Sequence, residues 1–92
     1  MSYLFSVRLG NKAEKQFKTL DRKMRERLET LFKILELNPV PREFHYDLEK
    51  LAGREDSYRV HLSSFRAIYR IYWSEKVVRV EKIERKSDST YD

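Results

Sequence analysis

The chain has 92 residues, of which 40% are hydrophobic and 38% are charged, and its formal net charge at neutral pH is +5. This length suffices for one small core and not for two, so we expect residues 1–92 to form a single domain. The absence of cysteine excludes disulfides, thiolate metal sites and cysteine nucleophiles, and it fits a reducing cytoplasm. The basic balance favours a polyanionic partner, such as nucleic acid, an anionic membrane or an acidic protein.

No stretch of the sequence approaches the roughly 20 apolar residues that cross a bilayer. The first ten residues are too short and too charged for a signal peptide. We therefore expect a cytoplasmic protein that does not contact a membrane.

The amino-terminal stretch predicts a strand followed by a helix. Residues 3–8 alternate between apolar and other side chains, which is typical of a β-strand. The alternation breaks at Gly10 and Asn11. We expect Asn11 to cap the helix, with Glu14 three residues on as its capping-box partner.

The next segment predicts a helical hairpin. Apolar residues recur at helical spacing of three and four, at Ala13, Phe17, Leu20, Met24, Leu28, Leu31, Phe32 and Leu35. One continuous helix would run about 36 Å, which is about the width of a domain of this size. We therefore expect a break near residues 20–22, with Asp21 as the N-cap of the second helix; one long coiled-coil helix is the alternative. Asn38 before Pro39 ends the second helix, because a residue before proline avoids the α region.

The remainder predicts β-structure. Residues 47–51 form a short strand before a turn at Gly53, and residues 57–62, 65–73 and 77–84 alternate as strands do. Ser63-Ser64 and Glu75-Lys76 fit two-residue hairpin loops, although neither has the glycine that such turns prefer. The fold class is therefore α+β: an N-terminal strand, a helical hairpin, then an antiparallel sheet of three to four strands packed on the helices.

These loops set the predicted faces of the sheet, because side chains alternate with a period of two. The apolar face collects Tyr58, Val60, Leu62, Phe65, Ala67, Tyr69, Ile71 and Trp73 and packs on the helices. The opposite face collects Arg59, His61, Arg66, Ile68 and Arg70. The second loop also sets Arg66 opposite Arg85, so that His61, Arg66 and Arg85 form one row. Lys82 then falls on the apolar face, and a β-bulge or an edge position would remove that misfit.

The predicted row has the chemistry of an anion site. Like charges directly opposite each other destabilise a sheet, so the row indicates a phosphate ligand; a merely solvated basic face is the alternative. Arginine binds phosphate through two parallel hydrogen bonds and stays charged, and His61 exchanges protons near neutrality. RNA supplies its own nucleophile, the 2′-hydroxyl, and Tyr91 would either move a proton or stack on a base. The sequence offers no metal-ligand set and no glycine-rich phosphate loop, so we expect no metal and no cofactor.

Several short motifs together resemble the RelE/ParE toxin superfamily over nearly the whole chain. They are Lys50-Leu51-Ala52-Gly53, Tyr58-Arg59-Val60-His61-Leu62, Phe65-Arg66-Ala67-Ile68-Tyr69, and Ile83-Glu84-Arg85-Lys86 followed by Tyr91. The ending resembles the RelE type, and residues 39–43 resemble archaeal RelE. The resemblance implies a RelE-like fold and a toxin of a type II toxin–antitoxin system.

The RelE type implies a ribosome-dependent, metal-independent endonuclease that cleaves mRNA in the A site by 2′-hydroxyl attack. It implies catalytic roles for Arg59, His61, Arg66, Arg85 and Tyr91, although His61 stands where the family usually has lysine or arginine. It implies a RelB-type antitoxin, the ribosome and mRNA as partners. A ParE-like inhibitor of DNA gyrase, or a catalytically inactive binding member of the same fold, is the alternative.

Overall fold

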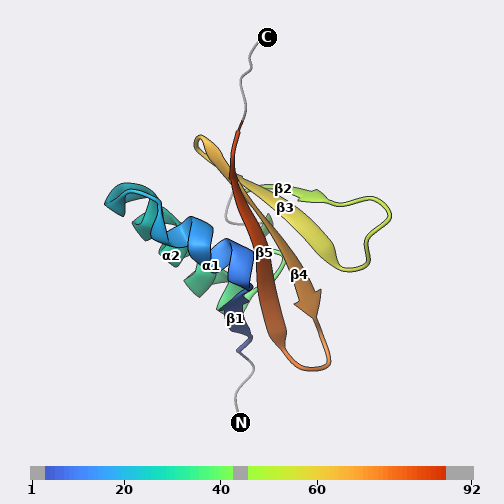
Figure 1. The fold of residues 1–92 in the computed structure, drawn as a ribbon. Helices are drawn as coiled ribbons and strands as arrows, with labels where there is room; N and C mark the ends of the chain where they lie inside the picture. The colour runs from blue at the N-terminus through green and yellow to red at the C-terminus, as the bar shows by residue number, and fades with distance from the viewer. Residues whose placement is uncertain (1–3, 43–45, 87–92) are drawn as a thin grey trace.

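The computed structural model describes residues 4–42 and 46–86 (Figure 1). The elements follow the order β1 (Ser6–Leu9), α1 (Asn11–Lys18), α2 (Arg22–Leu37), β2 (Asp47–Lys50), β3 (Ser57–Leu62), β4 (Phe65–Tyr72) and β5 (Val77–Arg85). The predicted α+β architecture is confirmed, with both helices on one side of the sheet (Figure 1).

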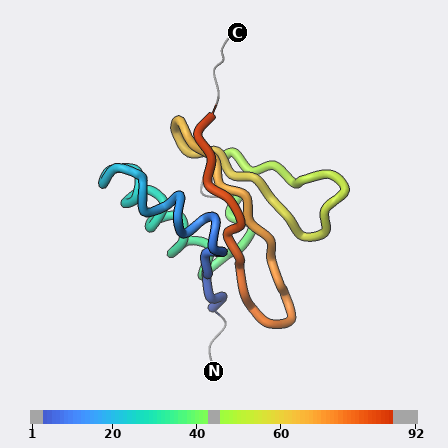
Figure 2. Tube along the Cα trace, viewed as in Figure 1, coloured from blue at the N-terminus to red at the C-terminus, as the bar shows by residue number. Residues whose placement is uncertain are grey.

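The N-terminal strand enlarges the sheet beyond the predicted three to four strands. The order is β1-β5-β4-β3-β2, and β1 pairs in parallel with β5 while the other neighbours are antiparallel. Figure 2 shows the first and last strands of the chain side by side. A parallel pair needs a long crossover, and the helical hairpin together with the later strands provides it. No helix in the described ranges is long and apolar enough to cross a membrane.

The helical hairpin breaks where the sequence predicts. Helix α2 begins after Asp21, whose carboxylate accepts a hydrogen bond of 2.9 Å from the Met24 amide. It ends at Leu37, with Asn38 as C-cap before the proline. The cap of α1 was predicted wrongly: Gly10 is the N-cap and Asn11 is already helical. The Gly10 amide donates to the Val80 carbonyl at 2.9 Å, which holds the strand's end against β5 and starts the helix one residue early.

The core lies between the helices and the apolar face of the sheet. Its fully buried members include Ala13, Leu28, Leu31, Leu35, Val60, Tyr69, Val78 and Val80. Tyr69 brings a polar group into this layer, and its hydroxyl donates to the Pro39 carbonyl at 2.7 Å. Burial raises the pKa of the Tyr69 hydroxyl. This bond fastens the end of the helical hairpin to the centre of the sheet.

Tyr69→Phe is expected to lower the free energy of unfolding by about 1–2 kcal/mol, because it leaves the Pro39 carbonyl without its donor. Urea denaturation measures the change. The matched control is Tyr58→Phe, since the Tyr58 ring stacks on Tyr69 at 5.9 Å and its hydroxyl has no hydrogen bond within the described ranges. Equal losses in the two variants would show that the Tyr69 hydroxyl bond adds nothing.

The hairpin between β3 and β4 has the predicted register. Leu62 pairs with Phe65, His61 with Arg66, and Arg59 with Ile68. Ser63 adopts the left-handed region with φ of 53°, which allows the two-residue turn without glycine. The sheet face turned away from the helices, here called the outer face, therefore carries Arg59, His61 and Arg66.

The hairpin between β4 and β5 differs from the prediction. Tyr72 pairs with Val77, so the loop contains the four residues between them instead of two, and Ile71 pairs with Val78. The Lys76 amide donates to the Trp73 carbonyl at 3.2 Å, and Lys76 takes a positive φ of 55°, which closes the four-residue loop. Trp73, predicted on the core face, lies in the loop and is 48% exposed, with its ring edge-on to Phe5.

A β-bulge shifts the register a second time along the same strand pair. Tyr69 pairs with Val80 and Ile68 with Lys82, which leaves Glu81 as the extra residue. The bulge removes the misfit at Lys82 by moving it to the outer face. It also sets Ile83 opposite Ala67 in the core, instead of opposite Ile68 as predicted.

Candidate nucleic-acid interface

Three of the five predicted site residues lie together on the outer face. His61 and Arg66 are direct cross-strand partners on β3 and β4, and Arg59 lies two residues before His61 on the same strand and face. Side chains of direct partners stand about 5 Å apart at Cβ. All three side chains are partly accessible. The face thus offers two guanidinium groups and one imidazole to a ligand from solvent.

The prediction that His61, Arg66 and Arg85 form one row is wrong for Arg85. Arg66 pairs with Glu84, and Arg85 pairs with Phe65 on the helix side of the sheet. The guanidinium of Arg85 lies over the Phe65 ring at 5.2 Å. It lines a hollow of about 500 Å³ beside the turn between the helices. The single extra residue of the bulge causes this, because a one-residue slip turns every later side chain to the other face. Tyr91 lies outside the described residues.

Carboxylates that the sequence analysis did not place flank the three cationic residues. Glu49 on β2 accepts a hydrogen bond of 2.9 Å from Arg59, and the same oxygen lies 3.7 Å from His61 Nε2. Glu84 accepts from Arg66 Nε at 2.9 Å and from Lys82 at 3.1 Å. The outer face therefore alternates in charge at this end, which removes the repulsion that a purely cationic row would carry.

The cationic neighbours keep both carboxylates ionised. The hydrogen bond from Arg59 lowers the pKa of Glu49. Partial burial raises the pKa of Glu84, and hydrogen bonds and charge from Lys82 and Arg66 outweigh that effect, so its pKa lies below the usual value. These ion pairs orient the guanidinium groups, and they must open or shift when an anionic ligand binds there.

Arg59 has a donor that Glu49 does not use. Its Nε is buried without a hydrogen-bond partner in the described part of the chain. A hollow of about 490 Å³ lies beside it, lined by Glu49, Lys50, Leu51, Ala52, Arg54, Arg59 and Ile68. The hollow thus presents the apolar side chain of Ile68 together with the unpaired Nε donor of Arg59, a combination that suits a ligand with both a flat and an anionic part. No group of three potential metal ligands occurs within residues 4–42 and 46–86.

Comparison with known proteins places this geometry in a family. Residues 7–89 match the profile described as ParE toxin of type II toxin–antitoxin system, parDE. The chain belongs to the ParE toxin family. The predicted membership of the RelE/ParE superfamily is thereby confirmed.

Two archaeal proteins are similar to this toxin in sequence. A protein of Methanocaldococcus jannaschii that is named as a toxin, RelE1, is 29% identical over 82 residues, which cover 89% of this toxin and 90% of the relative. The archaeal RelE–RelB complex of Pyrococcus horikoshii contains a chain 31% identical with a TM-score of 0.82, over 94% of this toxin and 99% of that chain.

A bacterial likeness supports the fold alone. The E. coli RelBE toxin–antitoxin complex matches with a TM-score of 0.76 at 23% identity, over 92% of this toxin and 99% of that chain. The predicted RelE-like fold is therefore confirmed, and the protein is a RelE-family toxin of the type II class.

Proposed function

We propose that this toxin is a ribosome-dependent endoribonuclease that cleaves mRNA in the A site by attack of the ribose 2′-hydroxyl, without a metal ion. The supporting observation is that Arg59, His61 and Arg66 lie together and partly accessible on one face of a RelE-like sheet. Guanidinium groups bind the phosphodiester and stabilise the charge that develops on its oxygens. Translation stops because the message is cut.

In the proposed reaction, His61 takes the proton from the 2′-hydroxyl as that oxygen bonds to the adjacent phosphorus. The bond from phosphorus to the 5′-oxygen breaks, which leaves a 2′,3′-cyclic phosphate and a 5′-hydroxyl. Glu49, 3.7 Å from His61 Nε2, stabilises the imidazolium that forms. Arg59 and Arg66 hold the phosphoryl oxygens, while Tyr91 or His61 returns a proton to the leaving oxygen. A catalytic role for Arg85 is a prediction of the family resemblance.

Substrate binding requires an exchange of partners at Arg66. The guanidinium must release Glu84 in order to take a phosphate with its Nε donor. Lys82 lies 3.1 Å from the same carboxylate, so Glu84 keeps a cation beside it when Arg66 turns to the substrate. Glu84 is therefore proposed as an internal competitor that sets the affinity for RNA.

Glu84→Gln is expected to tighten binding of RNA about fivefold, because a partly exposed ion pair of this kind is worth up to about 1 kcal/mol. Fluorescence anisotropy with a labelled 2′-O-methyl RNA, which cannot be cleaved, measures the change. The matched control is Glu29→Gln on α2, an exposed carboxylate on the helix side. Equal tightening by both variants would assign the effect to net charge and contradict competition at Arg66.

We infer that a RelB-type antitoxin restrains the toxin, because its relatives from P. horikoshii and E. coli were crystallised as complexes with RelB. An acidic antitoxin would complement the net charge of +5 and associate quickly through electrostatic steering.

Cleavage on programmed ribosomes tests the proposed function. The expected result is cleavage of mRNA in the A site that persists in EDTA and leaves 2′,3′-cyclic phosphate ends. The matched family is described as a ParE toxin, so the ParE-like inhibitor of DNA gyrase that the resemblance implies is the second candidate. Intact mRNA together with inhibited supercoiling would replace the nuclease with that function. The absence of both activities would indicate a binding protein without catalytic activity.

A further inference from the structure

A second set of arginines crosses the outer face at the opposite end of the sheet. Arg8 on β1 pairs with Arg79 on β5, and Arg79 pairs with Arg70 on β4. We call these three residues the arginine row. Like charges at directly opposed positions destabilise a sheet, and here three adjacent strands place arginine at one level. Such an arrangement is costly without an anion to bind.

The charges of the arginine row are poorly compensated, in contrast to those of Arg59 and Arg66. Arg70 lies 3.8 Å from Glu55, a carboxylate that is 82% exposed. Arg8 and Arg79 make no ion pair with any residue in the ranges 4–42 and 46–86. Both are exposed. The row therefore presents at least two guanidinium groups whose charges no neighbouring carboxylate occupies.

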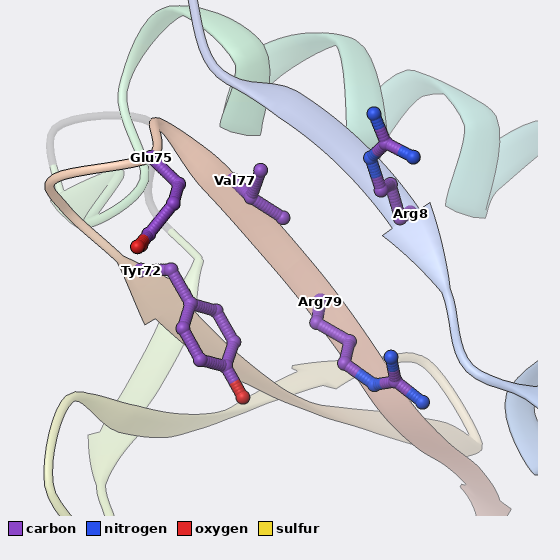
Figure 3. Close-up of a pocket in the computed structure, with 5 residues that line it drawn as sticks. All are labelled: Arg8, Tyr72, Glu75, Val77 and Arg79. Carbon is purple, nitrogen blue, oxygen red and sulfur yellow. The ribbon is translucent and has the colours of Figure 1, made fainter.

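The absence of a side chain at Gly10 leaves space for the side chain of Arg79. A Cβ at Gly10 would lie 3.0 Å from Arg79 Nη2 and 3.3 Å from its Nε. The guanidinium thus packs against the chain where β1 passes into α1, because Gly10 has no side chain there. This contact holds Arg79 on the side of β5 that faces Arg8 (Figure 3).

A hollow of about 230 Å³ lies beside the row, lined by Arg8, Tyr72, Glu75, Val77 and Arg79 (Figure 3). Tyr72 and Glu75 stand on one side of β5, and Arg8 stands on β1 at the other (Figure 3). The Arg70 guanidinium lies over the Tyr72 ring, 5.1 Å from the centre of that ring. The hollow thus combines an aromatic wall, an apolar floor at Val77, two guanidinium groups and the carboxylate of Glu75, which forms no ion pair with either arginine.

We propose that the arginine row and this hollow form a second RNA-binding site, which takes one unpaired nucleotide. Arg8 and Arg79 bind its phosphate, and the base stacks on Tyr72. Unpaired bases stack on aromatic side chains beside cationic grooves, whereas the aspartate and glutamate side chains of an acidic peptide carry no ring that could stack on Tyr72. The inference rests on the proposed function in naming RNA as the ligand.

The two sites lie on one continuous surface. Arg66 and Arg70 share the outer face of β4 and are four residues apart, which is about 13 Å at about 3.3 Å per residue. That distance equals about four steps of a stacked strand at 3.4 Å per step. One RNA chain therefore reaches both sites, and the second site anchors the strand while the first acts on a phosphodiester a few nucleotides away.

Salt-dependent binding of a labelled 2′-O-methyl single-stranded RNA to the full chain tests the proposal. The variant is Arg8→Gln with Arg79→Gln, and the matched control is Lys23→Gln with Arg27→Gln, which removes the same charge from exposed positions of α2. The expected result is at least tenfold weaker binding at low salt. The slope of log Kobs against log salt should also fall by about 0.7, because the two arginines together contact one phosphate. Wild-type protein that binds no RNA, or a variant that matches the control, overturns the proposal.

Variants of Tyr72 test the base contact separately. Tyr72→Phe keeps the ring and is expected to bind as wild type, whereas Tyr72→Leu is expected to bind about fivefold to hundredfold more weakly. Circular dichroism verifies that both fold. If the arginine variant loses binding to poly-glutamate and keeps binding to RNA, the row serves an acidic polypeptide and the proposal fails.

The 2′-O-methyl RNA separates this inference from the nuclease proposal. It lacks the nucleophile, so binding is measured whether or not the toxin cleaves. A toxin that cuts no mRNA but loses RNA affinity in the arginine variant supports the second site and refutes the nuclease. If the toxin cleaves mRNA, and the variant without Arg8 and Arg79 binds RNA as well as the wild type does, the nuclease proposal is supported and the second site is refuted.

Discussion

Arg66→Ala is expected to lower the rate of mRNA cleavage on programmed ribosomes by about 10²–10³-fold, the usual effect of removing one donor that stabilises transition-state charge. Arg66 is the guanidinium next to His61 across the strand pair, so it is placed to hold the phosphate whose neighbouring hydroxyl His61 deprotonates. Lys82 keeps Glu84 paired in the variant. The fold should therefore lose at most about 1 kcal/mol.

Two further variants sharpen this experiment. Arg27→Ala removes an exposed arginine from α2 and is expected to cleave at the wild-type rate. Arg66→Lys keeps the charge without the planar fork and is expected to fall between wild type and Arg66→Ala. A rate for Arg66→Ala within threefold of wild type would refute the role given to this residue.

Arg85→Ala distinguishes the structure from the family resemblance. The described position of Arg85 on the helix side predicts a much smaller loss than that of Arg66→Ala. Equal losses would mean that the end of β5 rearranges on the ribosome. Full toxicity of the double variant Arg66→Ala with Arg85→Ala would overturn the mechanism.

Leu31→Ala is expected to lower the free energy of unfolding by about 2–5 kcal/mol, since it removes buried methyl groups and leaves a cavity. Leu31 on α2 is completely buried against the sheet. A domain of this size has only about 5–15 kcal/mol of stability in total, so the loss is a large fraction of it. Urea denaturation gives the change from the midpoint and the slope.

The same helix offers the matched control for that prediction. Leu37→Ala makes the identical chemical change at a side chain that is 67% exposed, and it is expected to change stability by no more than about 0.5 kcal/mol. Similar losses at Leu31 and Leu37 would contradict the placement of the core between the helices and the sheet.

Local patterns were sufficient for most elements and for the first hairpin. Apolar spacing predicted both helices, and Asp21 predicted the break between them, because a side-chain cap acts within three residues. The two-residue turn at Ser63 and Ser64 fixed the pairing of His61 with Arg66. That pairing is short-range, so alternation along two strands sufficed to bring Arg59, His61 and Arg66 to one face.

Long-range pairing set the remaining features of the site. The parallel contact of β1 with β5, which aligns Arg8 with Arg79, joins segments about 70 residues apart and leaves no local pattern. Glu49 meets Arg59 through a shorter-range pairing, because the neighbouring strands β2 and β3 are antiparallel and set these two residues directly opposite each other. The β-bulge at Glu81 turns Arg85 away from Arg66 and sets Glu84 in its place.

The sequence by itself therefore determined the order of the elements, most of the core apart from Trp73 and Ile83, and the cationic residues of one hairpin. The tertiary structure alone decided which carboxylates pair with those cationic residues, and on which face Arg85 lies. It also brought Arg8, Arg79 and Arg70 into one row. The physical reason is that side-chain alternation is a local property of each strand. The cross-strand partner of a residue, and the face of the sheet on which it lies, depend instead on loop length and on a single inserted residue. Long-range packing selects both of these.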